Sequence, residues 1–156
     1  MRRSIDSVSE IVKFVLLTMA LYFAAQTVIV ILHEHAHSTA AWLLGYTPTP
    51  FTVVWGNPLT ILGWDEGVPY DQLFRSPGHP VEALIGGIPL LMHSLFAAFG
   101  LYFLQRPLSN LRQFPFYALY WFVVANQTEL VAYIVMRPFA GSGDTERFNE
   151  GLRLSP

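Results

Sequence analysis

Residues 14–37 read FVLLTMALYFAAQTVIVILHEHAH, and they combine an apolar run with a dense polar cluster. The run from Phe14 to Leu32 carries no charge. At about 1.5 Å per helical residue it can cross a hydrocarbon layer of roughly 30 Å. Three histidines and one glutamate then follow within residues 33–37. Ionisable groups inside an apolar helix are costly and are usually functional. The stretch therefore predicts a transmembrane helix that carries a functional site.

The composition of the whole chain favours a lipid environment. Of its 156 residues, 53% are hydrophobic and only 13% are charged, whereas soluble domains carry about 25% charged residues. The net charge of −2 and the lack of a basic cluster exclude a nucleic-acid surface. The chain has no cysteine. Any metal ion must therefore be held by His, Asp or Glu side chains.

Two further apolar stretches are long enough to span a bilayer. Together with the first, they predict spans at about residues 14–44, 81–104 and 115–137. We therefore expect an all-α membrane protein, with residues 1–156 forming one multi-pass domain. In the first connection, β-prone residues 51–55 and 59–64 flank a Gly-Asn-Pro turn, and this predicts a short β-hairpin at the membrane face.

The residues of the polar cluster have the spacing of a metal site. His33 and His37 are four residues apart, so both imidazoles project from one face of a helix, one turn apart. They can bind one zinc ion, and Glu34 can move a proton between a water that the ion activates and a leaving amine. His35 points about 200° away from His33 and should stand outside the ligand set. The alternatives are a polar contact between helices, or a haem or metal site without hydrolysis.

The segments HEHAHSTAAWLLGYTPTPFTVVWGNP and ALIGGIPLLMHSLFAAF resemble the zinc-motif helix, the following loop and the second core helix of a known family. This is the site-two protease family of intramembrane zinc metalloproteases, particularly its small bacterial members. The resemblance covers most of residues 14–156, and the His-Glu-x-x-His pattern is its specific element. It implies a zinc protease of the bacterial inner membrane that acts on a membrane protein substrate.

The family draws a third zinc ligand from an aspartate in or after the third core helix. Its usual Asn-Pro-x-x-Asp-Gly form is absent here, because Gln127 follows Asn126 and Leu130 stands four residues on. The segment AGSGDTERFNEGL resembles a Gly-Ser-Asp element near the C-terminus of some small members. This resemblance nominates Asp144 as the third ligand.

Glu129 is the rival third ligand. Counted along straight helices, Glu129 lies at nearly the same depth as His33, whereas Asp144 would lie about 27 Å beyond the midpoint of the third span. Asp144 can return to the histidines only through a bend, which the Pro and Gly residues between positions 138 and 143 can supply. We prefer Asp144 and keep Glu129 as the alternative.

Two other polar residues lie within the expected spans. His93 is expected either to support the site through hydrogen bonds or to contact the substrate. Asn126 could bind a substrate strand or join two helices.

The orientation of the chain in the membrane is left open by the sequence. Basic residues before the first span and in the second connection favour a cytoplasmic N-terminus, which puts His33 and His37 in the outer half. The family usually has its zinc nearer the cytoplasmic face. Both candidate third ligands stay toward the same end of the bundle in either case.

The sequence thus favours an intramembrane zinc metalloprotease. Two alternatives remain. One is a catalytically inactive relative that serves as an accessory subunit of a larger membrane complex, since the chain is short and lacks the usual aspartate motif. The other is a membrane subunit that uses its histidines to bind haem or another metal.

Overall fold

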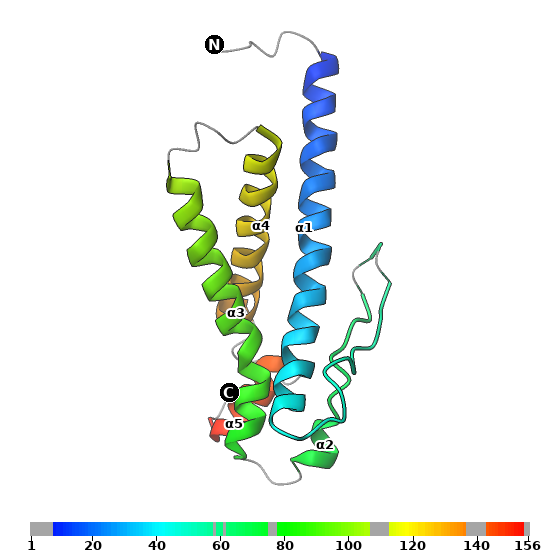
Figure 1. Cartoon of the computed structure of the whole chain (residues 1–156), viewed down its shortest axis with the longest axis vertical. Helices are drawn as coiled ribbons and strands as arrows, with labels where there is room; N and C mark the ends of the chain where they lie inside the picture. The colour runs from blue at the N-terminus through cyan, green and yellow to red at the C-terminus, as the bar shows by residue number, and fades with distance from the viewer. Residues whose placement is uncertain are drawn as a thin grey trace.

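The computed structural model describes residues 8–57, 59–60, 62–74, 78–106, 113–136 and 143–154. These residues are mainly helical and contain no strand. The elements are α1 (Val8–Leu43), α2 (Tyr70–Leu73), α3 (Pro80–Gln105), α4 (Gln113–Val131), the π-helix η1 (Ala132–Met136) and α5 (Asp144–Leu152). Figure 1 shows α1, α3 and α4 as three long helices side by side, with α2 and α5 at one end of this bundle. In this arrangement α1 and α4 run in the same direction and α3 runs in the opposite one.

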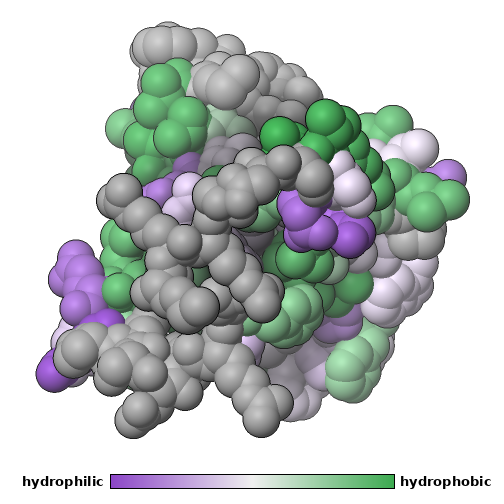
Figure 2. Space-filling view, turned by 90° about the horizontal axis from the view of Figure 1, so that it is seen from above, coloured by the Kyte–Doolittle hydropathy of each residue, from purple (hydrophilic) through white to green (hydrophobic). Residues whose placement is uncertain are grey.

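Three of the described helices are long and apolar enough to cross a membrane. They cover Val8–Leu43, Pro80–Gln105 and Phe114–Val135. In the most apolar window of the first helix only 6% of residues are buried within the protein, so most of its side chains face outward. Figure 2, which views the chain along its long axis, shows hydrophobic residues on the outer surface of the described helices. The helical character of the described residues and the presence of three long apolar helices are therefore confirmed, while residue 137 of the third expected span lies outside the described residues.

Small residues allow α5 to pack closely on α3. A side chain at Gly151 would lie 2.3 Å from the backbone nitrogen of Ala83, and one at Gly86 would lie 3.1 Å from the carbonyl oxygen of Asp144. Only glycine permits such close contact between backbones. Gly143, which precedes α5, has a φ of 85° that also favours glycine. These contacts fix the start of α5, and with it Asp144, against α3.

The described residues do not support the predicted β-hairpin. The two limbs of this loop, which contain the β-prone residues 51–55 and 59–64, run antiparallel. In the described residues they form only two isolated bridges, Val54–Asp65 and Asn57–Leu62. One reason is that α1 occupies hydrogen-bonding groups of the first limb. The hydroxyl of the buried Ser38 donates to the carbonyl of Pro50 (2.8 Å) and accepts from the amide of Thr52 (3.1 Å). Backbone groups at the start of this limb therefore pair with a helix side chain and not with a second strand. Residues 58 and 61 lie outside the described residues.

Candidate metal centre

Three potential metal ligands meet at the end of the bundle where α5 packs. His33 Nε2 and His37 Nε2, one turn apart on α1, lie 3.2 Å from each other. Asp144 Oδ2, from the start of α5, lies 2.7 Å from His33 Nε2 and 3.3 Å from His37 Nε2. Both histidines are buried, and only 13% of the Asp144 side chain is exposed. This group could hold a metal ion.

The distances between the three atoms suit a small tetrahedral ion. With metal–ligand bonds of about 2.0–2.1 Å, two ligands of tetrahedral zinc are separated by about 3.3 Å. The two distances to His37 Nε2 lie close to this value, and the third is shorter. Two imidazoles and one carboxylate also form a ligand set that catalytic zinc sites use, with a fourth position left open. The residues present therefore fit a zinc ion.

Asp144 is ionised, as a metal ligand must be. Burial acts to raise the pKa of its carboxyl group, but hydrogen bonds from His33 and His37 in their protonated form, and the positive charge of the two imidazoles, outweigh this effect and lower the pKa below its ordinary value. A bound cation would take the place of these protons. The carboxylate is thus negatively charged at neutral pH. Its position at the N-terminus of α5 also favours a negative charge.

Glu129, the alternative third ligand, lies elsewhere. Its carboxylate accepts a hydrogen bond from the side-chain amide of Gln26, which joins α4 to α1. Among the described residues, Glu129 does not belong to the group of potential metal ligands. The structure therefore brings Asp144, and not Glu129, to the two histidines.

A proline in α3 provides the hydrogen bond that orients His37. Pro89 has no backbone N–H, so the carbonyl of Ile85, four residues earlier, lacks its usual helical partner. His37 Nδ1 lies 2.7 Å from this carbonyl oxygen, to which it can only donate. The proton of the ring is thereby held on Nδ1, and the lone pair of Nε2 is directed at Asp144 and His33.

A second hydrogen-bonded chain orients His33. Asn126 Nδ2 donates to the carbonyl of Phe122 (2.8 Å), so its Oδ1 accepts from His93 Nδ1 (2.9 Å). His93 Nε2 is then an acceptor and lies 3.0 Å from His33 Nδ1, which donates to it. The lone pair of His33 Nε2 consequently faces the proposed ion. Three acceptor atoms repel one another at these distances unless a cation or a proton lies among them.

His93 and Asn126 are therefore placed behind the ligands. Both side chains are fully buried, and their polar atoms contact protein groups. This geometry gives no support to the substrate contact expected for them as one alternative. It fits the other expectation for His93, a supporting role through hydrogen bonds.

Replacing His93 with Phe tests this supporting role. The substitution keeps an aromatic ring but removes the nitrogen that accepts from His33. We expect the zinc affinity of the purified chain to fall about 10- to 100-fold, as is typical when a metal-binding histidine loses its hydrogen-bond partner. The dissociation constant can be measured in detergent by competition with a chelator.

The matched control for this variant is Ser94→Ala. Ser94 is the next residue of α3, is exposed, and donates to the carbonyl of Leu90 in its own helix (2.8 Å). Its removal should leave zinc affinity unchanged. Equal affinities for the wild type and His93→Phe would show that His93 does not orient the ligand.

Glu34 lies beside the three ligands. On a helix it projects about 60° from His37 and 100° from His33. The half-buried side chain is close enough to His37, Glu66 and Asp144 for their charges to act on it, in agreement with these angles. His35 points elsewhere, as expected. Its ring lies against Phe51 and Trp55 of the loop after α1, with ring centroids 6.2 and 5.9 Å away.

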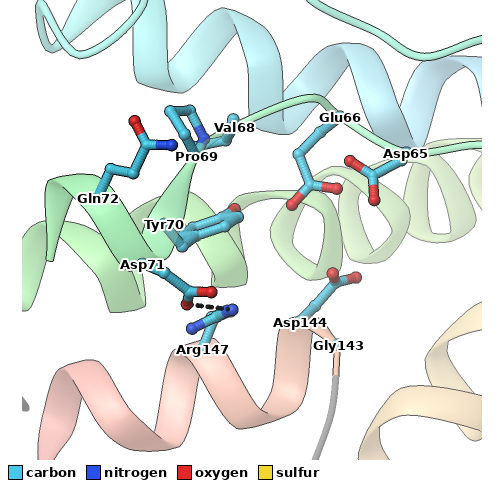
Figure 3. Close-up of a pocket in the computed structure, with 10 residues that line it drawn as sticks. All are labelled: Asp65, Glu66, Val68, Pro69, Tyr70, Asp71, Gln72, Gly143, Asp144 and Arg147. Atoms are coloured by element: carbon cyan, nitrogen blue, oxygen red, sulfur yellow. Dashed lines mark hydrogen bonds and ion pairs between the residues drawn. The ribbon is translucent and has the colours of Figure 1, made fainter. Parts of the chain in front are cut away.

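A pocket of about 320 Å³ adjoins Asp144. Figure 3 shows the carboxylates of Asp65, Glu66 and Asp144 around this space, with the hydroxyl end of Tyr70 directed toward Glu66. Arg147 of α5 lines it from the side opposite Glu66. An open space next to the ligands is where a substrate could approach them.

Apart from Asp144, the sequence pattern did not identify the residues of this pocket, and it did not identify the role of Ile85. Residues 65–71 match no sequence motif. Their position in the pocket depends on how this part of the chain folds over α1 and α5, which the sequence pattern does not reveal. Ile85 could have been found through Pro89, since a proline within a helix frees the carbonyl four residues earlier.

No family model matches this chain, and neither a curated protein nor a solved structure matches it. The resemblance to the site-two protease family therefore stays a prediction that rests on the residues of this chain.

Proposed function

We propose that the protein is a multi-pass intramembrane zinc metalloprotease of a bacterial inner membrane. Its substrates would be transmembrane or membrane-proximal segments of other proteins. The observation that carries this proposal is the meeting of Asp144 with His33 and His37, beside the carboxylate of Glu34. Two imidazoles, a carboxylate ligand and a neighbouring glutamate are the groups that zinc-dependent peptide hydrolysis requires.

Each residue has a distinct task in this proposal. His33, His37 and Asp144 would hold the zinc ion, which when bound supplies a Lewis acid that makes water acidic enough to ionise near neutral pH. Glu34 takes the proton from the attacking water and later delivers it to the amine of the leaving peptide. His93 and the carbonyl of Ile85 keep the two imidazoles in orientation.

The substrate segment must be unwound where it is cut. In a helix each carbonyl accepts a hydrogen bond from the chain itself, and water cannot reach it easily. An extended segment exposes its carbonyls. We therefore expect cleavage near the end of a transmembrane helix, or where glycine or proline weakens it.

Removal of the metal tests the proposal. The protein purified in detergent should contain one zinc ion per chain, measured by elemental analysis, and should cleave a membrane-spanning peptide. Treatment with a chelator should abolish cleavage, and added zinc should restore it. Added magnesium or calcium should not, since these ions prefer oxygen ligands to imidazole.

The same experiment separates the alternatives. A chain that binds zinc but cleaves none of a broad set of membrane peptides would match the inactive accessory subunit. Haem absorption in the purified protein, or the absence of zinc, would match the haem- or metal-binding subunit. Either result would contradict the protease.

A further inference from the structure

The pocket beside Asp144 carries an excess of negative charge. Asp65, Glu66, Asp71 and Asp144 line it, and Arg147 is the one described basic residue that does so. The charge of Arg147 is already shared among three carboxylates. Its guanidinium nitrogens lie 2.9 Å from Asp71, 3.4 Å from Glu150 and 3.5 Å from Glu82.

Asp65 and Glu66 remain without a compensating cation. Neither forms an ion pair with a Lys or Arg in the part of the chain that the structure describes. Their backbone is held in place, because Thr52 Oγ1 donates to the carbonyl of Glu66 (3.0 Å) and the amide of Gly67 donates to Asp65 Oδ1 (2.8 Å). The two carboxylates are thus fixed at the pocket without neutralisation by these neighbours.

A buried hydroxyl in the same pocket lacks a partner at normal hydrogen-bond geometry. Tyr70 is 6% exposed, and its hydroxyl is directed toward Glu66 but forms no hydrogen bond of normal length and angle within the described structure. Burial, and then the negative charge of Glu66, raise the pKa of Tyr70 above its ordinary value, so the phenol stays neutral. Buried hydroxyls nearly always have a partner. A buried hydroxyl that faces a pocket can find its hydrogen-bond partner in a bound ligand.

We propose that this pocket binds a basic side chain, Lys or Arg, of the peptide substrate. Glu66 and Asp65 would attract the positive charge, and the Tyr70 oxygen would accept a hydrogen bond from the ammonium or guanidinium group. The proposal rests on the protease function and specifies the sequence that the enzyme selects.

The size and place of the pocket fit this occupant. Its volume of about 320 Å³ is at the lower end of the range for ligand pockets, roughly 300–1,000 Å³, which suits one side chain better than a large ligand. The pocket lies where α2 and α5 gather at one end of the bundle. Long Lys and Arg side chains near the ends of transmembrane helices reach toward the membrane interface. A basic residue that flanks the cleaved segment can therefore enter the pocket from this end of the bundle.

Binding without cleavage provides the test. The full-length, zinc-loaded Glu34→Gln variant is mixed in detergent with fluorescent membrane-spanning peptides. Each peptide carries one Lys at a different flanking position, or Gln at that same position. We expect one Lys position to bind about tenfold more tightly than its Gln counterpart, as a charged hydrogen bond provides. Adding Glu66→Gln, Asp65→Asn or Tyr70→Phe should reduce this preference and leave the affinity for the Gln peptide unchanged.

Glu150→Gln is the matched control. Glu150 also contacts Arg147 but does not line the pocket, so the preference for Lys should persist. Circular dichroism and zinc content identify any variant that fails to fold. Equal binding of all Lys and Gln peptides would overturn the proposal. So would a preference that survives Glu66→Gln and Asp65→Asn, or one that Glu150→Gln removes equally.

Two further measurements distinguish this proposal from binding of a lipid amine and from failure of the protease function. If the preference for Lys disappears in phosphatidylethanolamine nanodiscs but not in phosphatidylcholine nanodiscs, a lipid amine occupies the pocket and the peptide proposal falls. If the wild type binds the Lys peptide selectively but leaves every peptide intact, the protease function falls and the basic-residue pocket is supported.

Discussion

Glu34→Gln is expected to lower the rate of peptide cleavage by about 10²- to 10⁴-fold while the zinc content stays unchanged. The range is that of a general acid–base group removed from an active site. Glutamine keeps the size and polarity of the side chain but cannot take up the proton of the attacking water. The substitution leaves the three candidate metal ligands in place, because Glu34 is not one of the residues whose ligand atoms converge.

The measurement combines single-turnover cleavage with elemental analysis of the same sample. His35→Gln is the matched control, since His35 is the next residue of α1 and its ring lies against the loop after α1. It should retain both zinc and activity. Wild-type rates in Glu34→Gln would assign the proton transfer to another group, and loss of zinc would instead make Glu34 a ligand.

Asp144→Ala should lower zinc affinity by more than about 100-fold. Loss of a residue that only hydrogen-bonds to a metal ligand costs up to about 100-fold, and loss of a ligand itself should cost more. The substitution removes the carboxylate and leaves two buried imidazoles that cannot hold the ion by themselves. Cleavage should be lost as well. The affinity can be measured by competition with a chelator, as for His93→Phe.

Glu129→Ala is the matched control for Asp144→Ala. Both residues are carboxylates that contact α1, but Glu129 accepts a hydrogen bond from Gln26. Its removal should leave the zinc affinity close to that of the wild type. The reverse pattern, with zinc lost in Glu129→Ala and kept in Asp144→Ala, would transfer the ligand role to Glu129.

The helical features of the site could be predicted because they depend on local periodicity. The spacing of His33 and His37 gives the same geometry in any helix, and the apolar runs identify the helices that carry them. The third ligand could not be chosen in this way. Whether Asp144 reaches the histidines depends on how α5 packs on α3, and that contact is made by Gly86 and Gly151, far apart in the sequence.

The loop after α1 shows a different limit of prediction. Its residues favour strands, but Ser38 of α1 takes up two backbone groups where the first β-prone segment begins, the carbonyl of Pro50 and the amide of Thr52. β-propensity describes a residue on a half-buried sheet surface, and a loop tied to a helix does not provide one. Glu66 is held by another tertiary contact, from the Thr52 hydroxyl to its carbonyl, so the pocket could not be inferred from the sequence.

The order of the ligands along the chain affects how the site is assembled. His33 and His37 belong to the first long helix, whereas Asp144 follows the third. A ribosome must therefore produce all three long helices, and α5 must dock, before the three candidate ligands can meet around an ion. In the proposed protease, newly inserted chains that lack α5 would have an incomplete site, and neighbouring membrane proteins would be protected from cleavage during biosynthesis.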